Sequence, residues 1–150
     1  MINIALLHNE LANDPGNRGY AAFLAQTRDV EIAAILNAVD QSITVKDTFL
    51  DKDIYLTEIA PAYLVLATLS AQIQAKWYPI LAMVTNVATG MDLANNKVQG
   101  MHAVAVADGV LTQAQVDALG QRPGSRIEQL FAPGDVVTAL QVEAARKGNF

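Results

Sequence analysis

The segment Pro61–Met91, PAYLVLATLSAQIQAKWYPILAMVTNVATGM, contains one charged residue, Lys76, and is the basis of the predicted fold. Its large apolar side chains recur at helical spacing on both sides of that lysine: Tyr63, Leu66, Leu69 and Ile73, then Ile80, Val84, Val87 and Met91. Pro61 fits the first turn of a helix, and Pro79 is expected to open or kink the second helix. We therefore predict a buried helical hairpin that is the main source of gross stability.

A membrane hairpin is the alternative interpretation of this segment. The uncharged runs Ile59–Ala75 and Trp77–Met91 are each shorter than the ~20 apolar residues that a spanning helix needs. Polar side chains dilute both runs, and Met1–Leu7 lacks the basic region of a secretory signal. We therefore expect no membrane association.

Composition narrows the possible chemistry. A chain of 150 residues with 52% hydrophobic and 17% charged positions suits one domain with a sizeable core. The absence of cysteine from the sequence removes disulfides, thiolate zinc sites and thiol nucleophiles. A net charge of −5 argues against general nucleic-acid binding, which needs clustered lysine and arginine.

The C-terminal third contains a short internal repeat. VLTQAQVDA at Val110–Ala118 aligns with VVTALQVEA at Val136–Ala144, and each copy has threonine followed three residues later by glutamine. This is the spacing of a capping box, and Ser125 with Glu128 forms a third one after the expected turn at Pro123-Gly124. Three helices are predicted within a capped sub-module, residues 109–150: Gln113–Leu119, Arg126–Phe131 and Ala139–Lys147.

Capping residues and apolar spacing give weaker predictions of secondary structure for the remaining segments of the chain. Asp29 is predicted to be the N-cap of a helix over Val30–Val39, and a first helix carries Ile4, Leu7 and Leu11. In Gln41–Leu56, Ile43 and Val45 alternate with polar residues in the pattern of a short extended piece. We favour a solvated loop, with room for one helical turn, because a short strand there has no obvious partner. In Asp92–Ala107 a helix is favoured over a hairpin turning at Asn95-Asn96. The predicted fold is an all-α, single-domain bundle of seven or eight short helices around the hairpin.

Few residues are candidates for reaction chemistry. His8 and His102 are the only histidines in the sequence, and both lie beside apolar helical positions where packing is the usual role. Asp47, Asp51 and Asp53 lack the glycine that a calcium loop needs at its sixth position, which is Lys52 here. We therefore predict no catalytic, cofactor-binding or metal-binding residues.

A DNA-binding interpretation of Leu111–Phe131 is the main alternative. The Thr-Gln-Ala-Gln-Val opening is common in helix-turn-helix proteins, and Arg122 and Arg126 flank the second predicted helix. That helix has only six residues and one arginine, so it offers few contacts to bases. The alternative function is therefore a small helix-turn-helix regulator using residues 111–131.

Two stretches resemble a known group of proteins. The run LANDPGNRGY at Leu11–Tyr20, followed by Val30–Val39, resembles the opening of small uncharacterised proteins encoded by tailed bacteriophages. The Leu111–Ala145 pattern, with its Thr-Gln-Ala-Gln-Val and Ser-Arg-x-Glu steps, resembles their C-terminal ends. The resemblance covers the first and last quarters of the chain and implies a phage context without assigning any functional residue.

Together these observations predict a non-enzymatic structural component of a tailed-phage virion, at the neck, tail or capsid. It is expected in the virion and, during assembly, in the host cytoplasm. Its expected partners are copies of itself and other virion proteins, with no cofactor or small-molecule substrate. The candidate contact residues are Leu130, Phe131 and Phe150, because aromatic groups near loops and ends often anchor interfaces. Core packing is an equally good interpretation of Phe131.

Overall fold

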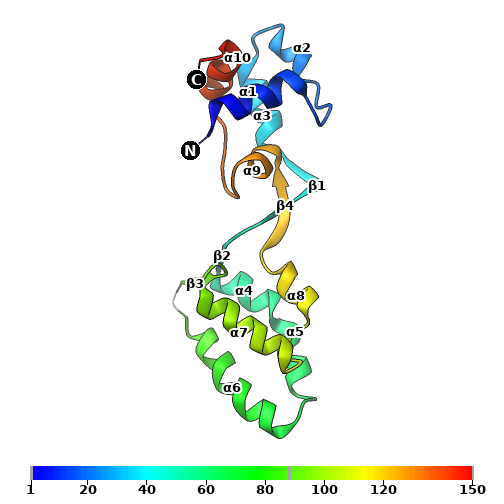
Figure 1. The fold of residues 1–150 in the computed structure, drawn as a ribbon, viewed down its shortest axis with the longest axis vertical. Helices are drawn as coiled ribbons and strands as arrows, with labels where there is room; N and C mark the ends of the chain where they lie inside the picture. The colour runs from blue at the N-terminus through cyan, green and yellow to red at the C-terminus, as the bar shows by residue number, and fades with distance from the viewer. Residues whose placement is uncertain (1, 88, 150) are drawn as a thin grey trace. The chain divides into compact units, whose positions relative to one another are not determined.

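A computed structural model describes residues 2–87 and 89–149, and Figure 1 shows its elements. Within these residues lie ten helices and four strands, which make up 58% and 13% of the chain. The prediction of an all-α bundle is therefore wrong, and the fold is mixed α/β. The chain divides into two compact units, unit 1 (Met1–Val45 and Arg122–Phe150) and unit 2 (Lys46–Gln121).

Unit 1 is built from both ends of the chain. Its elements are α1 (Ile4–Asn13), α2 (Tyr20–Leu24), α3 (Asp29–Asn37), β1 (Val39–Lys46), β4 (Gln121–Ser125), α9 (Arg126–Leu130) and α10 (Ala139–Lys147). Helix α10 packs against both α1 and α3. Leu7, Leu36 and Val142 from these three helices are fully buried in one core, which also holds Tyr20 and Ile127.

Strands β1 and β4 form a two-stranded antiparallel sheet, so the extended pattern at Ile43 and Val45 has a partner that the sequence did not indicate. The predicted loop at Gln41–Leu56 is thus wrong for β1, whose Ile43 and Val45 are buried. The predicted turn at Pro123-Gly124 is also wrong, because both residues lie in β4. A Cβ on Gly124 would lie 2.5 Å from the Val45 Cγ1, so glycine permits this close approach of the strands.

Unit 2 is formed by the middle of the chain. Its elements are β2 (Phe49–Asp51), α4 (Lys52–Glu58), α5 (Ala60–Leu66), α6 (Ala71–Thr85), β3 (Gly90–Asp92), α7 (Asn96–Ala107) and α8 (Gln113–Ala118). Strands β2 and β3 are antiparallel, with Leu50 opposite Met91. The helix predicted in Asp92–Ala107 is confirmed as α7, which begins after Asn95 rather than turning there.

The predicted helical hairpin is present as α5 and α6, with two corrections. Pro79 lies inside α6 instead of opening it, because the Ser70 side chain caps the helix nine residues earlier by accepting from the Ile73 N–H. The hairpin is also not buried on all sides. Trp77 and Leu81 enter the core, whereas Leu64 and Met83 are 77% and 72% exposed.

All three predicted capping boxes are confirmed. In each of α8, α9 and α10, the N-cap hydroxyl accepts a backbone N–H and the side chain three residues later accepts from the N-cap backbone. Helix α8 belongs to unit 2, and α9 and α10 belong to unit 1. The single-domain assignment, including the sub-module at 109–150, stays a prediction.

The N-cap predicted for α3 is wrong. Asp29 is the first residue of the helix, Arg28 is the N-cap residue, and no side chain caps this helix. The Asp29 carboxylate instead accepts two hydrogen bonds from the Arg146 guanidinium of α10, at 2.9 Å each. An ion pair between two helices therefore replaces the local cap.

Candidate functional site

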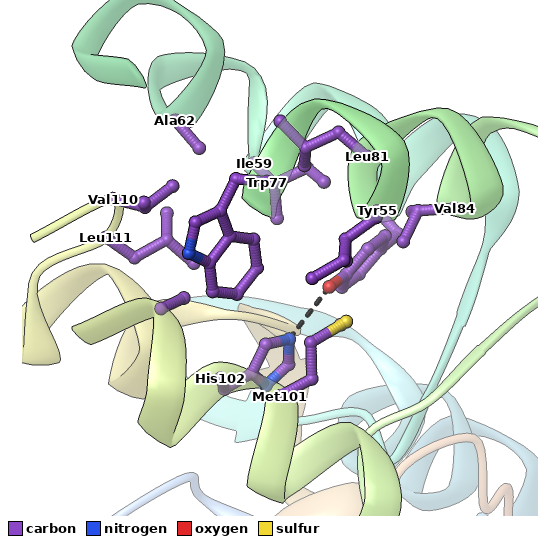
Figure 2. A pocket seen from close by; sticks show the side chains of 12 residues that line it. Tyr55, Ile59, Ala62, Trp77, Leu81, Val84, Met101, His102, Val110 and Leu111 are labelled. Atoms are coloured by element: carbon purple, nitrogen blue, oxygen red, sulfur yellow. Dashed lines mark hydrogen bonds between the residues drawn. The ribbon is translucent and has the colours of Figure 1, made fainter. Parts of the chain in front are cut away.

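A buried tyrosine–histidine pair is the first candidate site, and it lies in unit 2. Tyr55 comes from α4 and His102 from α7, and both side chains are buried. The Tyr55 Oη lies 2.8 Å from the His102 Nε2, and the two rings stack with centroids 5.9 Å apart. Figure 2 shows the two side chains pointing toward each other among apolar neighbours.

The space beside this pair is small. The cavity has a volume of about 20 Å³, which is room for one water molecule. Its wall includes Trp77, whose Nε1 donates to the Asp108 Oδ2 at 2.6 Å, and Lys76 Nζ lies 2.6 Å from the same oxygen. A cavity of this size has no room for an organic substrate.

Burial keeps both members of the pair neutral near pH 7. Desolvation, with a further contribution from Lys46, lowers the pKa of His102 below its ordinary value of 6.5. Burial also raises the pKa of the Tyr55 hydroxyl. The pair therefore links α4 to α7 through one hydrogen bond between uncharged groups, which is a structural role.

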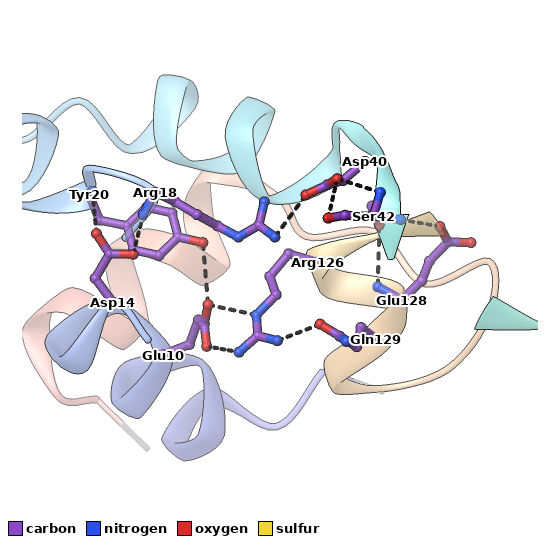
Figure 3. A network of polar contacts seen from close by, with 10 residues as sticks. Glu10, Asp14, Arg18, Tyr20, Asp40, Ser42, Arg126, Glu128 and Gln129 are labelled. Atoms are coloured by element: carbon purple, nitrogen blue, oxygen red, sulfur yellow. Dashed lines mark hydrogen bonds and ion pairs between the residues drawn. The ribbon is translucent and has the colours of Figure 1, made fainter. Parts of the chain in front are cut away.

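A second polar cluster lies inside unit 1, and Figure 3 shows it. Glu10 of α1 receives two hydrogen bonds from Arg126 of α9, Nε to Oε1 at 2.8 Å and Nη2 to Oε2 at 2.6 Å. Only 2% of the Glu10 side chain and 18% of the Arg126 side chain are exposed. The Tyr20 hydroxyl donates weakly to the same carboxylate, at 3.4 Å. These hydrogen bonds fix α9, whose N-cap is Ser125, to the N-terminal helix α1.

Two further ion pairs lie in unit 1, one between the loop before α2 and β1 and the other between β4 and α9. Arg18 donates to Asp40 at 3.1 Å, and Arg122 donates to Glu128 at 2.6 Å. The hydrogen bond from Arg122 lowers the pKa of Glu128 to about 2, helped by the N–H groups of Ser125 and Gly134. Glu128 thus combines its predicted capping role with an ion pair that the sequence did not indicate.

Of the three residues predicted to make protein contacts, the structure describes Leu130 and Phe131. Leu130 and Phe131 are half-buried, and Phe131 packs against the core of unit 1. Phe150 lies outside the described residues. The structure therefore favours core packing for Phe131 and adds no evidence for a contact role of the three residues.

The two histidines belong to different units, and Asp51 and Asp53 lie at the junction of β2 and α4. The His8 Nδ1 lies 2.6 Å from the Ala145 carbonyl oxygen in unit 1, whereas His102 lies in unit 2. Asp51 ends β2 and Asp53 lies in the first turn of α4. Within the described residues, no group of three or more acidic or histidine side chains is arranged to hold a metal ion.

The predicted helix–tight turn–helix at residues 111–131 is wrong as a motif. Strand β4 separates α8 from α9, and these helices belong to different units. Arg126, which the DNA-binding interpretation used, directs its guanidinium at Glu10. Among the described helices, each is too short or too polar to cross a membrane.

Sequence reasoning missed a set of exposed apolar side chains. In unit 1, Val30 and Leu140 are 68% and 75% exposed and line the same hollow between α3 and α10. In unit 2, the outward sides of α5 and α6 expose Leu64 and Met83. For Leu64 and Met83 the sequence signal is the charge-free runs around Lys76, which fit burial and exposure equally well.

Comparison with known proteins adds no assignment. The chain matches no protein-family model, no curated protein and no solved structure.

Proposed function

We propose that the protein is a non-enzymatic structural component of a tailed-phage particle that works through contacts with copies of itself and with neighbouring proteins. The observation that carries this proposal is the exposure of large apolar side chains on both units, Val30 and Leu140 on one and Leu64 and Met83 on the other. Large exposed apolar groups that gather in patches are typical of interaction sites. The phage context comes from the resemblance at the two ends of the chain.

The polar clusters support the same proposal. Glu10 and Arg126 join α1 to α9, and Tyr55 and His102 join α4 to α7, so these buried groups are engaged in holding the fold. The exposed apolar side chains of the two units take no part in these clusters and remain on the surface for partners. Such a surface recognises other proteins by shape.

A reconstitution experiment tests the proposal. Particles are prepared from a phage whose copy of this gene is deleted, the purified protein is added, and the mixture is separated on a density gradient. We expect the protein to move with the particles, and a host protein of similar size to stay behind as the control. Protein that remains entirely in the soluble fractions, at every particle concentration, contradicts the proposal.

A further inference from the structure

Helix α7 is joined to α4 through the Tyr55–His102 pair inside unit 2. Tyr55 is 2% exposed and His102 is 5% exposed, and both side chains line the small cavity of this unit (Figure 2). Within the described residues, the Tyr55 hydroxyl has one hydrogen-bond partner, the His102 Nε2 at 2.8 Å. A hydroxyl with one partner uses its proton there, so Tyr55 donates and the neutral imidazole accepts. The pair therefore depends on an unprotonated Nε2.

A proton on His102 removes this arrangement. Nε2 then carries a hydrogen and can only donate, so the Tyr55 hydroxyl has to turn its lone pair toward the ring and its own proton away from it. The cavity beside the pair is about 20 Å³ and is walled by apolar side chains such as Leu81 and Val84. One water there would gain a single partner, whereas buried waters typically make about three hydrogen bonds. The protonated pair is thus unsatisfied while the core stays closed.

The acidic groups of the helices that line the cavity do not offset a cation at His102. On α4, Asp53 is exposed, and Glu58 accepts from a backbone N–H at 2.9 Å. Asp108, at the end of α7, accepts from the lysine and from the tryptophan of α6, at 2.6 Å each. These carboxylates are therefore solvated or already engaged by other donors.

The other titratable groups of the surrounding elements are neutral or carry the same charge as a protonated histidine. Lys46, at the end of β1, adds to the effect of burial and lowers the pKa of His102. Burial raises the pKa of the Tyr63 hydroxyl on α5, which keeps it uncharged near pH 7. Lys76 of α6 is balanced by the carboxylate after α7, and Lys97 of α7 itself is exposed. A cation in the closed core would lack both hydration and an opposite charge.

Helix α7 has a weak point close to His102. Gly100 lies in the interior of the helix, two residues earlier, and is exposed. A Cβ at Gly100 would meet nothing within 4 Å, so packing does not require glycine there. Glycine inside a helix makes it less stable than alanine does. The turn of helix that carries the histidine is therefore one that opens easily.

We propose that the Tyr55–His102 pair is a proton-operated switch: when His102 gains a proton, α7 separates from α4 and the core of unit 2 opens locally. This inference goes beyond the proposed function and does not depend on it. In the open form the charged imidazole is hydrated, so the penalty of burial is removed. Opening also exposes apolar side chains that the closed form buries, among them Trp77 and Leu81.

The expected size of the effect follows from the linkage between protonation and opening. A hydrated histidine has its ordinary pKa of 6.5, and the closed core holds the pKa of His102 below this value. The closed form is therefore fully favoured above pH 6.5 and loses stability as the pH falls through the folded pKa. Between about pH 7.5 and pH 5.5, the population of the open form should rise by about tenfold.

Native-state hydrogen exchange of the full chain tests the proposal. Protection factors, corrected for the intrinsic effect of pH on exchange, report local opening segment by segment. Between about pH 7.5 and pH 5.5, the amides of α7 should lose about tenfold in protection, while those of α6 change by less than about twofold. Constant protection in α7 overturns the proposal. An equal loss in α6 also overturns it, because unit 2 then unfolds as a whole.

Three variants assign the response to the pair. His102→Gln keeps an acceptor for the Tyr55 hydroxyl but does not titrate, so α7 protection should no longer depend on pH. His8→Gln, the matched change at the other histidine of the sequence, should keep the full response. Gly100→Ala should raise α7 protection by about fivefold at both pH values and leave their ratio unchanged. A response that persists in His102→Gln, or that disappears in His8→Gln, overturns the proposal.

Circular dichroism checks that each variant is folded. If His102→Gln is not folded, an NMR titration of the His102 ring in the wild-type chain replaces it. Proton uptake at His102 that coincides with the loss of α7 protection supports the proposal. Proton uptake while α7 stays protected overturns it, because the closed core then accommodates the charged ring.

Discussion

Glu10 and Arg126 form a largely buried ion pair that joins α1 to α9 in unit 1. Replacing Arg126 with methionine preserves most of the side-chain volume but leaves the Glu10 carboxylate buried without its partner. We expect Arg126→Met to lower the free energy of unfolding by about 3 kcal/mol, as measured by urea denaturation followed by circular dichroism. The exposed pair of Arg28 with Glu31 supplies the control, since Arg28→Met should have a much smaller effect.

The double variant Glu10→Leu with Arg126→Met distinguishes this explanation from simple loss of packing. Removing both charges also removes the uncompensated carboxylate, so much of the lost stability should return. A double variant that is less stable than Arg126→Met alone contradicts the account of this pair.

His102 makes the stability of unit 2 depend on pH. Its folded pKa is lower than its ordinary value of 6.5, so the neutral form is favoured in the folded state. The stability from this group is fully present above the unfolded pKa and is lost as the pH falls through the folded pKa. Unfolding followed by Trp77 fluorescence should therefore show falling stability below about pH 6.5. His102→Gln should remove this pH dependence. If the stability of the variant falls below about pH 6.5 as much as that of the wild type, His102 is not the cause.

Glu128 predicts a separate change at lower pH in unit 1. Its pKa falls from an ordinary 4.5 to about 2 in the folded protein, chiefly through the hydrogen bond from Arg122. Its contribution is present above pH 4.5 and disappears as the pH approaches 2, a loss on the order of 2–3 kcal/mol. Glu128→Gln retains the capping acceptor without the charge, so circular dichroism should show a flatter pH profile. Identical profiles for wild type and variant would contradict the assignment.

These residue pairs could not have been predicted from the sequence. Glu10 and Arg126 are 116 positions apart, and Tyr55 and His102 are 47 apart. A lone histidine beside apolar positions indicates packing, but it does not identify a tyrosine partner. Only the fold brings such groups into contact.

At the scale of elements, the capping boxes are the most predictable feature, because each depends on two residues three positions apart. Thr138→Ala removes the hydroxyl that accepts from the Gln141 N–H, so α10 should lose its cap. We expect a loss of about 1 kcal/mol in the free energy of unfolding, measured by urea denaturation. Thr138→Ser keeps the hydroxyl and is the matched control, and equal losses in both variants contradict a capping role.

The strands were missed for the opposite reason, since their pairing is not local. Strand β1 at Val39–Lys46 pairs with β4 at Gln121–Ser125, far along the chain, and β4 contains proline and glycine. Both residues normally indicate a turn. In a two-stranded sheet every strand is an edge, which tolerates Pro123, and Gly124 accommodates Val45.

At the scale of the whole molecule, the two units have separate apolar cores, one containing Leu7 and Val142 and the other Trp77 and Leu66. The expectation of one domain requires both to unfold together. Trp77 is the only tryptophan in the sequence and reports on unit 2, whereas circular dichroism reports on all helices. If the unfolding transitions measured by Trp77 fluorescence and by circular dichroism coincide, they support the single-domain prediction. Two separate transitions contradict it.

Hydrophobic patterning predicted the helical hairpin but not which side of it faces water. The charge-free runs around Lys76 fit burial on every side equally well, and only the fold shows that Leu64 and Met83 remain exposed. The apolar content is therefore divided between the core and the exposed surface. This is the physical basis for assigning the molecule a role in contacts.

The number of copies of this protein in each purified phage particle, measured by quantitative mass spectrometry, is the most direct test of that role. The account predicts a fixed copy number that is the same in independent preparations and survives nuclease treatment and washing. A protein found only in trace, variable amounts, while abundant in the infected cells, would contradict it.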